Sequence, residues 1–228
     1  MPFFCLAGFK RAIAPLMTHR VRLEMRQGQA VLLSFATFAA CIISYEVFDV
    51  PAARYCAAVG YRTRDIFALI TELGLSTPYL VAAVAAFIYL RFVKRSQILA
   101  NAAAFLFAAV ALSGLANDLV KVIAGRSRPG LLLSEGIYTF EPFTNQYYYA
   151  SFPSGHANTI AALCYGLSMA GCRFKYVLPG IALAVMASRV IVGAHFPSDV
   201  MFGAYLGVVV TELTAVGFEK KGLPVRRR

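Results

Sequence analysis

Long apolar stretches alternate with short polar segments along the chain. Six stretches contain at most one charged residue each: 27–45, 73–90, 96–117, 157–172, 176–198 and 200–218. A bilayer core about 30 Å thick takes roughly 20 mostly apolar residues per helix, and most of these stretches approach that length. The pattern therefore predicts an all-α, polytopic membrane protein with six transmembrane helices.

Two polar segments beside these stretches are expected on the membrane surface. Residues 1–28 carry five basic residues after their first apolar stretch, an order that does not fit a cleaved signal peptide and favours a basic interfacial segment. Residues 65–74 place apolar side chains at helical spacing. This second pattern predicts a short helix lying parallel to the membrane.

The distribution of basic residues predicts how the spans are oriented. With six spans both termini lie on one side, and 15 of the 22 Lys and Arg residues fall in segments on that side. Cytoplasmic segments of membrane proteins are enriched in these residues. Both termini are therefore expected in the cytoplasm, and the long loop between Arg128 and Pro153 is expected on the opposite side.

Composition supports the membrane interpretation and excludes other classes of protein. Hydrophobic residues make up 59% of the chain and charged residues 14%, whereas a soluble domain is about half apolar and a quarter charged. The formal net charge of +11 does not indicate nucleic-acid binding, because Lys and Arg cluster between apolar stretches. We expect one domain over residues 1–228, in a bacterial cytoplasmic membrane, with no obligatory protein partner.

Several polar residues that topology does not explain fall in three clusters, all at span ends on the non-cytoplasmic side. The clusters are Lys121 with Arg128-Pro129, Pro153-Ser154-Gly155-His156, and Ser188-Arg189 with His195 and Asp199. Charged groups at membrane depth are costly and are candidates for function. We therefore expect the chemistry of the protein in the region 121–199.

Three cations of this region are suited to binding phosphate. Lys121, Arg128 and Arg189 supply positive charge, and the two guanidinium groups can hold phosphate oxygens bidentately. Lys121 and Arg128 would share one helix face if the helix persisted. Gly125 and Pro129 predict that it ends first, so that Arg128 reaches in from the loop.

A predicted helix start supplies a second kind of anion site. Ser154 and Gly155 precede the stretch 157–172, and the first N–H groups of a helix are unpaired and carry the positive end of its dipole. Gly155 allows close approach of the backbone to a ligand. The Ser154 hydroxyl can donate a hydrogen bond to an anion oxygen.

Two histidines complete the chemistry of phosphoryl transfer. Asp199 follows His195 by four residues, so its carboxylate is expected to accept a hydrogen bond from one ring nitrogen and leave the other as a nucleophile. His156 is then expected to protonate the leaving oxygen as a general acid. No carboxylate cluster has metal-ligand spacing, so no metal ion and no other cofactor is expected.

Together these motifs resemble the three-part signature of the type 2 phosphatidic acid phosphatase superfamily. The matching segments are Lys121-x6-Arg128-Pro129, Pro153-Ser154-Gly155-His156 and Ser188-Arg189-x5-His195-x3-Asp199. The resemblance implies a metal-independent lipid phosphatase with six helical spans. It implies that His195 forms a phosphohistidine, that Asp199 orients it, and that His156 protonates the leaving group and later activates water. Phosphate would be held by Lys121, Arg128, Ser154, Gly155 and Arg189.

The substrate and the phosphate acceptor stay open at this point. The lipid substrates that the resemblance implies are lipid A phosphate, undecaprenyl diphosphate, phosphatidylglycerol phosphate and phosphatidic acid. Water is the expected acceptor, and transfer to a second lipid by the same site is the alternative. A transport or scaffold protein with an inactive site ranks far lower, because charges along a permeation path would lie at several depths.

Four further features have simpler expected roles. The tyrosines at 147–149 are expected to form an aromatic belt at the membrane interface rather than to contact substrate. Asp118 is expected to be a structural partner of Lys121, and Arg126 a contact for lipid headgroups. Glu212, inside the last stretch, has no assigned role beyond extending towards the cytoplasmic headgroups.

Overall fold

The computed structural model describes residues 28, 31–144 and 146–225. The basic segment predicted over 1–28 therefore lies almost entirely outside the described residues. The chain divides into two units, residues 1–40 and 41–228. Residues 31–40 of the first unit are helical, and the second unit holds all the elements named below.

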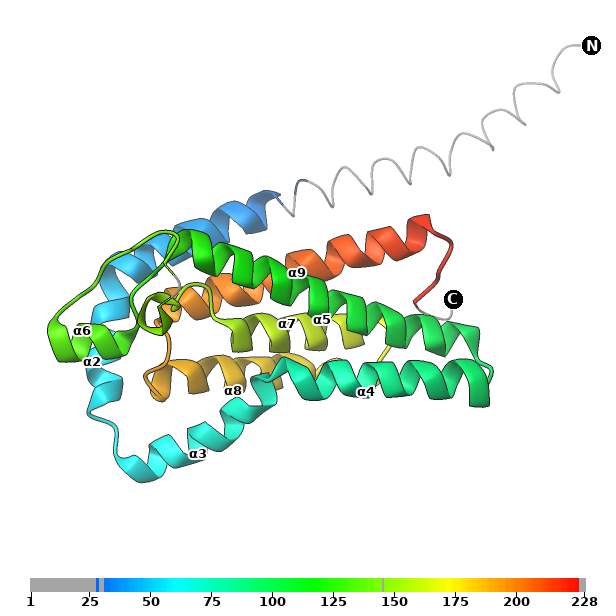
Figure 1. The fold of residues 1–228 in the computed structure, drawn as a ribbon, viewed down its shortest axis with the longest axis horizontal. Coiled ribbons are helices and arrows are strands. Elements are labelled where there is room, and N and C mark those ends of the chain that lie inside the picture. Colours follow the sequence, from blue (N-terminus) through cyan, green and yellow to red (C-terminus); the bar gives the residue numbers. More distant parts are fainter. Residues whose placement is uncertain (1–27, 29–30, 145, 226–228) are drawn as a thin grey trace, which may run out of the picture. The chain divides into compact units, whose positions relative to one another are not determined.

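The second unit is built from helices and the turns between them. In chain order the elements are η1 (Ser44–Phe48), α2 (Asp49–Ala57), α3 (Tyr61–Thr71), η2 (Glu72–Gly74), α4 (Ser76–Ile88), η3 (Tyr89–Val93), α5 (Gln97–Ala124), α6 (Pro129–Glu135), η4 (Tyr147–Tyr149), α7 (Gly155–Met169), α8 (Leu178–Ile191) and α9 (Pro197–Lys220) (Figure 1). The described residues contain no strand beyond an isolated bridge between Arg126 and Phe140. The predicted all-α class is confirmed.

Helix length divides the six predicted stretches into two groups. Four helical segments of the described chain are long and apolar enough to cross a membrane: Val31–Ala57, Tyr61–Val93, Gln97–Ala124 and Pro197–Lys220. The stretches predicted over 157–172 and 176–198 form α7 and α8, of 15 and 14 residues, which at 1.5 Å per residue reach only about 21–23 Å. The surface helix predicted over 65–74 forms parts of α3 and η2 inside the Tyr61–Val93 segment.

Helix α7 is the most buried helix of this unit and packs against α5, α8 and α9. Two glycines of α9 make its closest approach possible. A Cβ atom on Gly203 would lie 2.5 Å from the Ser154 carbonyl oxygen, and one on Gly207 would lie 2.4 Å from the Asn158 carbonyl oxygen. Small residues four apart let two membrane helices approach to backbone contact. The start of α9 is thereby held against the start of α7.

Local sequence also explains where the helices around the predicted site begin and end. α5 ends at Gly125, whose left-handed backbone (φ 56°) suits glycine, and a Cβ there would collide with the Glu141 carbonyl. α6 and α9 begin with Pro129 and Pro197 at the first helical position, where the missing N–H is not needed. In Figure 1 the end of α5, the end of α8 and the starts of α7 and α9 lie at one end of this bundle, beside α6.

Candidate active site

The end of α5 brings Lys121 to the start of α7. Its Nζ lies 3.9 Å from the position of a Cβ on Gly155, next to the first turn of α7. The Lys121 side chain is 22% exposed, and Asp118, which lies one turn earlier and is largely exposed, approaches its Nζ to 3.9 Å. The expected pairing of Asp118 with Lys121 is present but weak, because the carboxylate is solvated. Lys121 therefore keeps its charge available to a ligand.

Arg128 reaches the site from the loop, as the sequence predicts, and it is held by the backbone. Its Nε donates to the Tyr147 carbonyl at 3.0 Å and its Nη1 to the Ala194 carbonyl at 3.2 Å. The guanidinium also lies over the Tyr147 ring, 4.2 Å from the ring centre. Burial lowers the pKa of Arg128 from its ordinary value. An arginine side chain nevertheless stays cationic at neutral pH.

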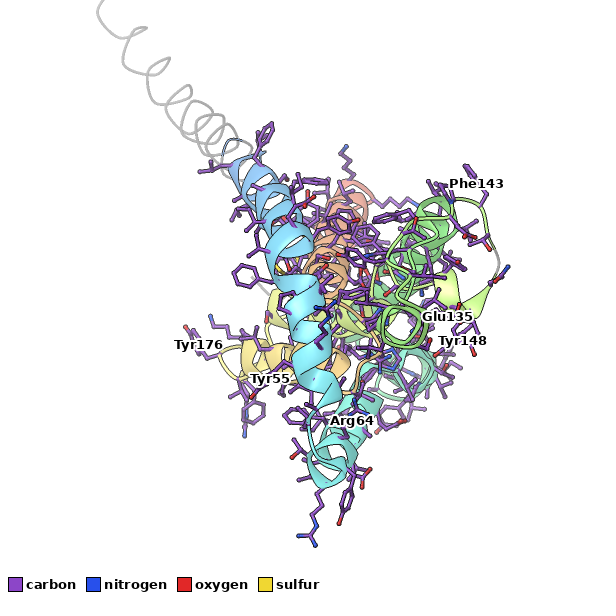
Figure 2. All side chains as sticks on the ribbon, turned by 90° about the vertical axis from the view of Figure 1, so that its left-hand side faces the viewer. Tyr55, Arg64, Glu135, Phe143, Tyr148 and Tyr176 are labelled. Carbon is purple, nitrogen blue, oxygen red and sulfur yellow. The ribbon has the colours of Figure 1, made fainter. Side chains whose placement is uncertain are left out.

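The loop between α6 and α7 carries aromatic side chains on its outer surface. Figure 2 shows Phe143 and Tyr148 pointing away from the helices, and both are exposed, as is Tyr147. Exposed tyrosine and phenylalanine side chains are typical of the boundary between headgroups and acyl chains. Tyr147 is exposed and also contacts Arg128 through its carbonyl and its ring.

Arg189, in the last turn of α8, is positioned by a residue that sequence analysis did not single out. Its Nη1 donates to the Thr71 hydroxyl at 2.7 Å. Its own carbonyl accepts the N–H groups of Ala194 and His195 at 3.1 and 3.2 Å. The side chain of Arg189 is thus fixed by the end of α3, while its backbone holds the loop that carries His195.

The start of α7 has the features of the predicted anion site. Ser154 is the residue before the helix and its side chain makes no capping bond. Its buried Oγ has no hydrogen-bond partner among the described residues, and its N–H donates to the Asp199 carbonyl at 3.0 Å. A Cβ on Gly155 would make only ordinary contacts with Asn117 and Lys121. An anion bound at this helix start would meet the Ser154 hydroxyl, the first N–H groups of α7 and Lys121 together.

His195 is buried, with 3% of its surface exposed, in the loop between α8 and α9. Its Nδ1 lies 2.8 Å from the Ser151 carbonyl oxygen. A carbonyl only accepts, so Nδ1 carries the proton and Nε2 is left with its lone pair. Burial, reinforced by Arg128 and Arg189, lowers the pKa of His195 to about 4, although Asp199 acts in the opposite direction. The ring is therefore neutral at neutral pH, as a nucleophile must be.

Asp199 does not make the hydrogen bond to His195 that the sequence analysis expected. Its Oδ2 lies 3.8 Å from His195 Nδ1, which is beyond hydrogen-bond distance. His195 precedes the first turn of α9, so the spacing of four residues does not amount to one helical turn here. Asp199 instead caps its own helix by accepting the Phe196 N–H at 2.9 Å, and it accepts the Ser151 hydroxyl at 2.6 Å.

His156, in the first turn of α7, lies against the chain segment before α4. A Cβ on Gly74 would lie 2.7 Å from both Cβ and Cδ2 of His156, so the bare glycine backbone packs directly on the imidazole. Lys121, Arg128, Arg189 and His195 all act electrostatically on the ring. The structure therefore brings together both histidines and the three cations that the sequence analysis singled out.

Asn117 is a polar residue of this region that sequence reasoning missed. It lies one turn before Lys121 on α5, it is buried, and neither of its amide atoms has a partner among the described residues. The Nδ2 atom lies 3.6 Å from the position of a Cβ on Gly155. Its spacing of four residues from Lys121 places both on one helix face, and that spacing was the available signal.

The expectation that Arg126 contacts lipid headgroups is wrong. Its side chain is 1% exposed, and its Nη1 donates to Asp199 and to the Ser198 hydroxyl, the latter at 2.7 Å. Its Nη2 donates to Asp49 at 2.7 Å and to the Tyr138 hydroxyl at 2.8 Å. Burial opposes the charge, but Asp199 and Asp49 outweigh it and raise the pKa of Arg126. Two buried carboxylates, and not the membrane surface, account for this cation.

Glu212 also differs from its expected position towards the headgroups. Its Oε2 accepts a hydrogen bond from the Tyr165 hydroxyl at 2.7 Å, between α7 and α9. The two side chains satisfy each other inside the bundle, which removes most of the cost of a polar pair at that depth. Glu212 lies far along α9 from His195.

The chemistry of this arrangement is that of phosphoryl transfer. Arg128 and Arg189 act electrostatically on both imidazoles, and Lys121 acts on that of His156. The hydrogen bond of His195 Nδ1 leaves the lone pair of Nε2 free. Such a site stabilises the charge of a phosphoryl group in transit. Within the described ranges no group of three or more His, Cys, Asp or Glu side chains gathers at metal-binding distance.

Comparison with known proteins agrees with this chemistry. The family model of the PAP2 superfamily matches residues 102–222. The chain belongs to this superfamily. Along most of its length it is similar to the lipid A 1-phosphatase of Rhizobium johnstonii, with 32% identity over 201 residues, covering 83% of this chain and 81% of that protein. The lipid A 1-phosphatase of Rhizobium etli is 31% identical, and the match covers 83% of this chain and 85% of that protein.

Two solved structures share the fold of this PAP2 protein. The crystal structure of Aquifex aeolicus LpxE has a TM-score of 0.55 and 22% identity, covering 74% of this chain and 94% of that one. The transmembrane PAP2 type phosphatidylglycerolphosphate phosphatase from Bacillus subtilis has a TM-score of 0.58 and 22% identity, and the match covers 82% of this chain and 96% of that one. The PAP2 protein described here is a lipid phosphatase, which is a phosphoric ester hydrolase, and it is a membrane protein.

Proposed function

We propose that this PAP2 protein removes the 1-phosphate of lipid A by way of a phosphohistidine on His195. The choice of lipid rests on the two Rhizobium lipid A 1-phosphatases, which match over 83% of this chain. The observation that carries the mechanism is the hydrogen bond from His195 Nδ1 to the Ser151 carbonyl, because it leaves Nε2 free to attack phosphorus.

The proposed reaction has two steps that share one phosphate position. Nε2 of His195 attacks phosphorus, the bond from phosphorus to the lipid oxygen breaks, and His156 gives its proton to that oxygen. His156 then takes a proton from water, the hydroxide attacks the phosphohistidine, and the bond from phosphorus to nitrogen breaks. Inorganic phosphate leaves and both rings return to their starting forms.

The phosphate is proposed to be held by groups that come from four different elements. Lys121 on α5, Arg128 before α6, Ser154 and Gly155 at the start of α7, and Arg189 on α8 surround it. The two guanidinium groups are anchored by hydrogen bonds, Arg128 to backbone carbonyls and Arg189 to the Thr71 hydroxyl, so their positions do not depend on the ligand. Preorganised charge of this kind is most effective where water is excluded.

The topology proposed for the protein places this site on the periplasmic face of the bacterial cytoplasmic membrane. The excess of Lys and Arg in the terminus-side segments supports cytoplasmic termini and six spans, with α7 and α8 as short central ones. Residues 1–228 act as one catalytic domain without a metal ion or a required protein partner. The exposed aromatic loop after α6 supports a headgroup-level site that leaves acyl chains in lipid.

The test is phosphate release by the detergent-purified protein from four lipids: lipid A, undecaprenyl diphosphate, phosphatidylglycerol phosphate and phosphatidic acid. We expect release from lipid A, with mass spectrometry showing loss of the 1-phosphate and retention of the other phosphate. The His195→Ala variant should release none, and Glu135→Gln, an exposed substitution on α6, should behave as wild type.

Other outcomes of this panel would redirect the assignment. Release from another lipid alone would replace the proposed substrate while keeping the mechanism. Formation of a phosphorylated acceptor lipid in place of inorganic phosphate would replace hydrolysis by transfer. Full activity of His195→Ala would contradict the phosphohistidine.

A further inference from the structure

Asp49, at the start of α2, is a fully buried carboxylate that none of the sequence motifs includes. Its exposed fraction is 0%. Its Oδ1 accepts the Ser44 hydroxyl at 2.8 Å and the Ser198 N–H at 3.0 Å, and its Oδ2 accepts Arg126 Nη2 at 2.7 Å and the Ser198 hydroxyl. A buried carboxylate in a membrane protein is costly unless it is paired, and this one accepts four hydrogen bonds. Asp49 is therefore a candidate for a functional role.

Arg126 connects Asp49 to Asp199 through the two ends of one guanidinium group. One nitrogen donates to Asp49 and the other to Asp199, so a single cation lies between two buried carboxylates. Four aromatic rings lie near it, those of Tyr45, Tyr138, Phe140 and Phe196, and the centre of the nearest, that of Phe196, is 4.4 Å from the guanidinium carbon. The planar fork explains why arginine occupies this position, because lysine cannot bond both carboxylates in this geometry.

Ser151 carries the network from Asp199 to the nucleophile. Its hydroxyl donates to Asp199 at 2.6 Å and its N–H donates to the Arg126 carbonyl at 3.0 Å. Its own carbonyl accepts His195 Nδ1 at 2.8 Å. Both the side chain and the backbone of Ser151 are therefore fixed by the Arg126 and Asp199 pair, and the direction of the His195 ring follows from that.

We propose that Asp49 is a positioning residue of the phosphatase site, acting through Arg126, Ser198 and Asp199 on the Ser151 carbonyl that orients His195. This role rests on the proposed function of His195 as the nucleophile. Asp49 lies outside the three motifs and outside the residues 102–222 that match the superfamily model. Helix α2 thereby takes part in the site.

The charge arrangement distinguishes positioning from simple stabilisation. Replacing a buried ion pair by apolar residues of similar volume is often neutral or stabilising, so such pairs are weak evidence for a role in stability. Removing the charge of Asp49 alone leaves Arg126 free to move towards Asp199, which shifts Ser151 and turns His195. The phosphate-binding cations contact none of these residues through a side-chain bond that the structure shows, so binding of a ground-state phosphate should not change.

The experiment compares Asp49→Asn with Glu46→Gln, an exposed acid one turn earlier on the same segment. Each detergent-purified variant is titrated with inorganic phosphate and with orthovanadate, and thermal shift reports binding. When the nucleophilic nitrogen bonds to vanadate, the vanadium atom becomes five-coordinate and resembles phosphorus in the transition state. Vanadate affinity therefore reports the geometry of phosphoryl transfer. Phosphate release from lipid A is measured in parallel.

For Asp49→Asn we expect vanadate affinity and kcat to fall by at least about tenfold, with phosphate affinity and KM within about twofold of wild type. Glu46→Gln should match wild type in vanadate affinity, phosphate affinity, kcat and KM. Equal weakening of vanadate and phosphate, or an Asp49→Asn variant that behaves as Glu46→Gln does, would overturn the role of Asp49. A merely structural residue would lower the amount of folded protein without changing the ratio of the two affinities.

Two further outcomes separate this role from the proposed function. If the wild type binds vanadate but releases no phosphate from lipid A, the substrate assignment fails, and the ratio of affinities in Asp49→Asn still decides the role of Asp49. If the wild type binds neither anion, both proposals fall. If Asp49→Asn does not fold, Ser44→Ala, which removes one hydrogen-bond donor to Asp49, takes its place. Ser44→Ala should weaken vanadate binding about threefold more than phosphate binding. Equal losses of the two affinities would overturn the role of Asp49.

Discussion

The contact between Gly74 and His156 gives a sharp test of the general acid. A Cβ added at Gly74 would lie 2.7 Å from two atoms of His156 and 2.9 Å from a third, whereas ordinary contact begins at 3.4 Å. The ring must therefore retreat by about 0.7 Å, or η2 must withdraw from α7 by as much. Gly74 lies in a 3₁₀ turn without a left-handed backbone, so Gly74→Ala adds little other strain.

A displacement of that size should reduce the chemical step more than binding. General acid catalysis contributes roughly 10²–10⁴-fold, and a shift near 1 Å can cost about 10²-fold. We expect kcat of Gly74→Ala on lipid A to fall by about 30- to 100-fold with KM little changed. With p-nitrophenyl phosphate, whose leaving group needs little protonation, the loss should stay within about threefold.

The assay is phosphate release from both substrates by wild type, Gly74→Ala and Gly114→Ala, in which the added methyl meets nothing within 4 Å. Gly114→Ala should match wild type on both. An equal loss on the two substrates in Gly74→Ala would contradict the role of His156 as general acid, because damage to the fold and not displacement of the acid would explain it. Unchanged activity on lipid A would refute it as well.

Three further predictions follow from individual contacts. Burial lowers the pKa of His195 to about 4, so its ring should stay neutral and able to attack as pH falls from 8 to 5. It should become protonated only below pH 5. NMR titration of the ¹⁵N-labelled imidazole measures this protonation, and a midpoint near 6.5 would contradict the prediction. Gly207→Ala puts a Cβ 2.4 Å from the Asn158 carbonyl oxygen and should destabilise the protein by about 1–3 kcal/mol in thermal unfolding, while Gly217→Ala, with open space around it, should not. Phosphate release should be the same in EDTA as in buffer with magnesium, and complete loss in EDTA that magnesium restores would contradict a metal-independent site.

Much of the site follows from local sequence because short-range rules decide it. Gly125 and Pro129 predict the break that sends Arg128 into the loop, and the structure has this break. Ser154 at the start of α7 follows from the same kind of rule. Each depends only on the backbone preferences of one or two neighbouring residues.

Other features depend on contacts that no local pattern contains. Asp49 and Arg126 are 77 residues apart in sequence, and so the burial of Arg126 is visible only once the first segment is packed. Gly74 and Thr71 reach His156 and Arg189 from outside the motifs. The expected bond between Asp199 and His195 assumed one continuous helix, whereas α9 starts at Pro197 between them. Gly203 and Gly207, by contrast, show a readable spacing of small residues that predicts close helix packing.

The most direct test of the phosphohistidine mechanism is to find where phosphate is bound on the protein during turnover. Protein mixed with ³²P-labelled lipid A is quenched in alkaline detergent, in which phosphohistidine is stable, and the labelled peptide is identified by mass spectrometry. We predict label on His195 in the wild type and none in His195→Ala, as a phosphohistidine intermediate requires. Turnover with no label on His195, or label on another residue, would contradict it.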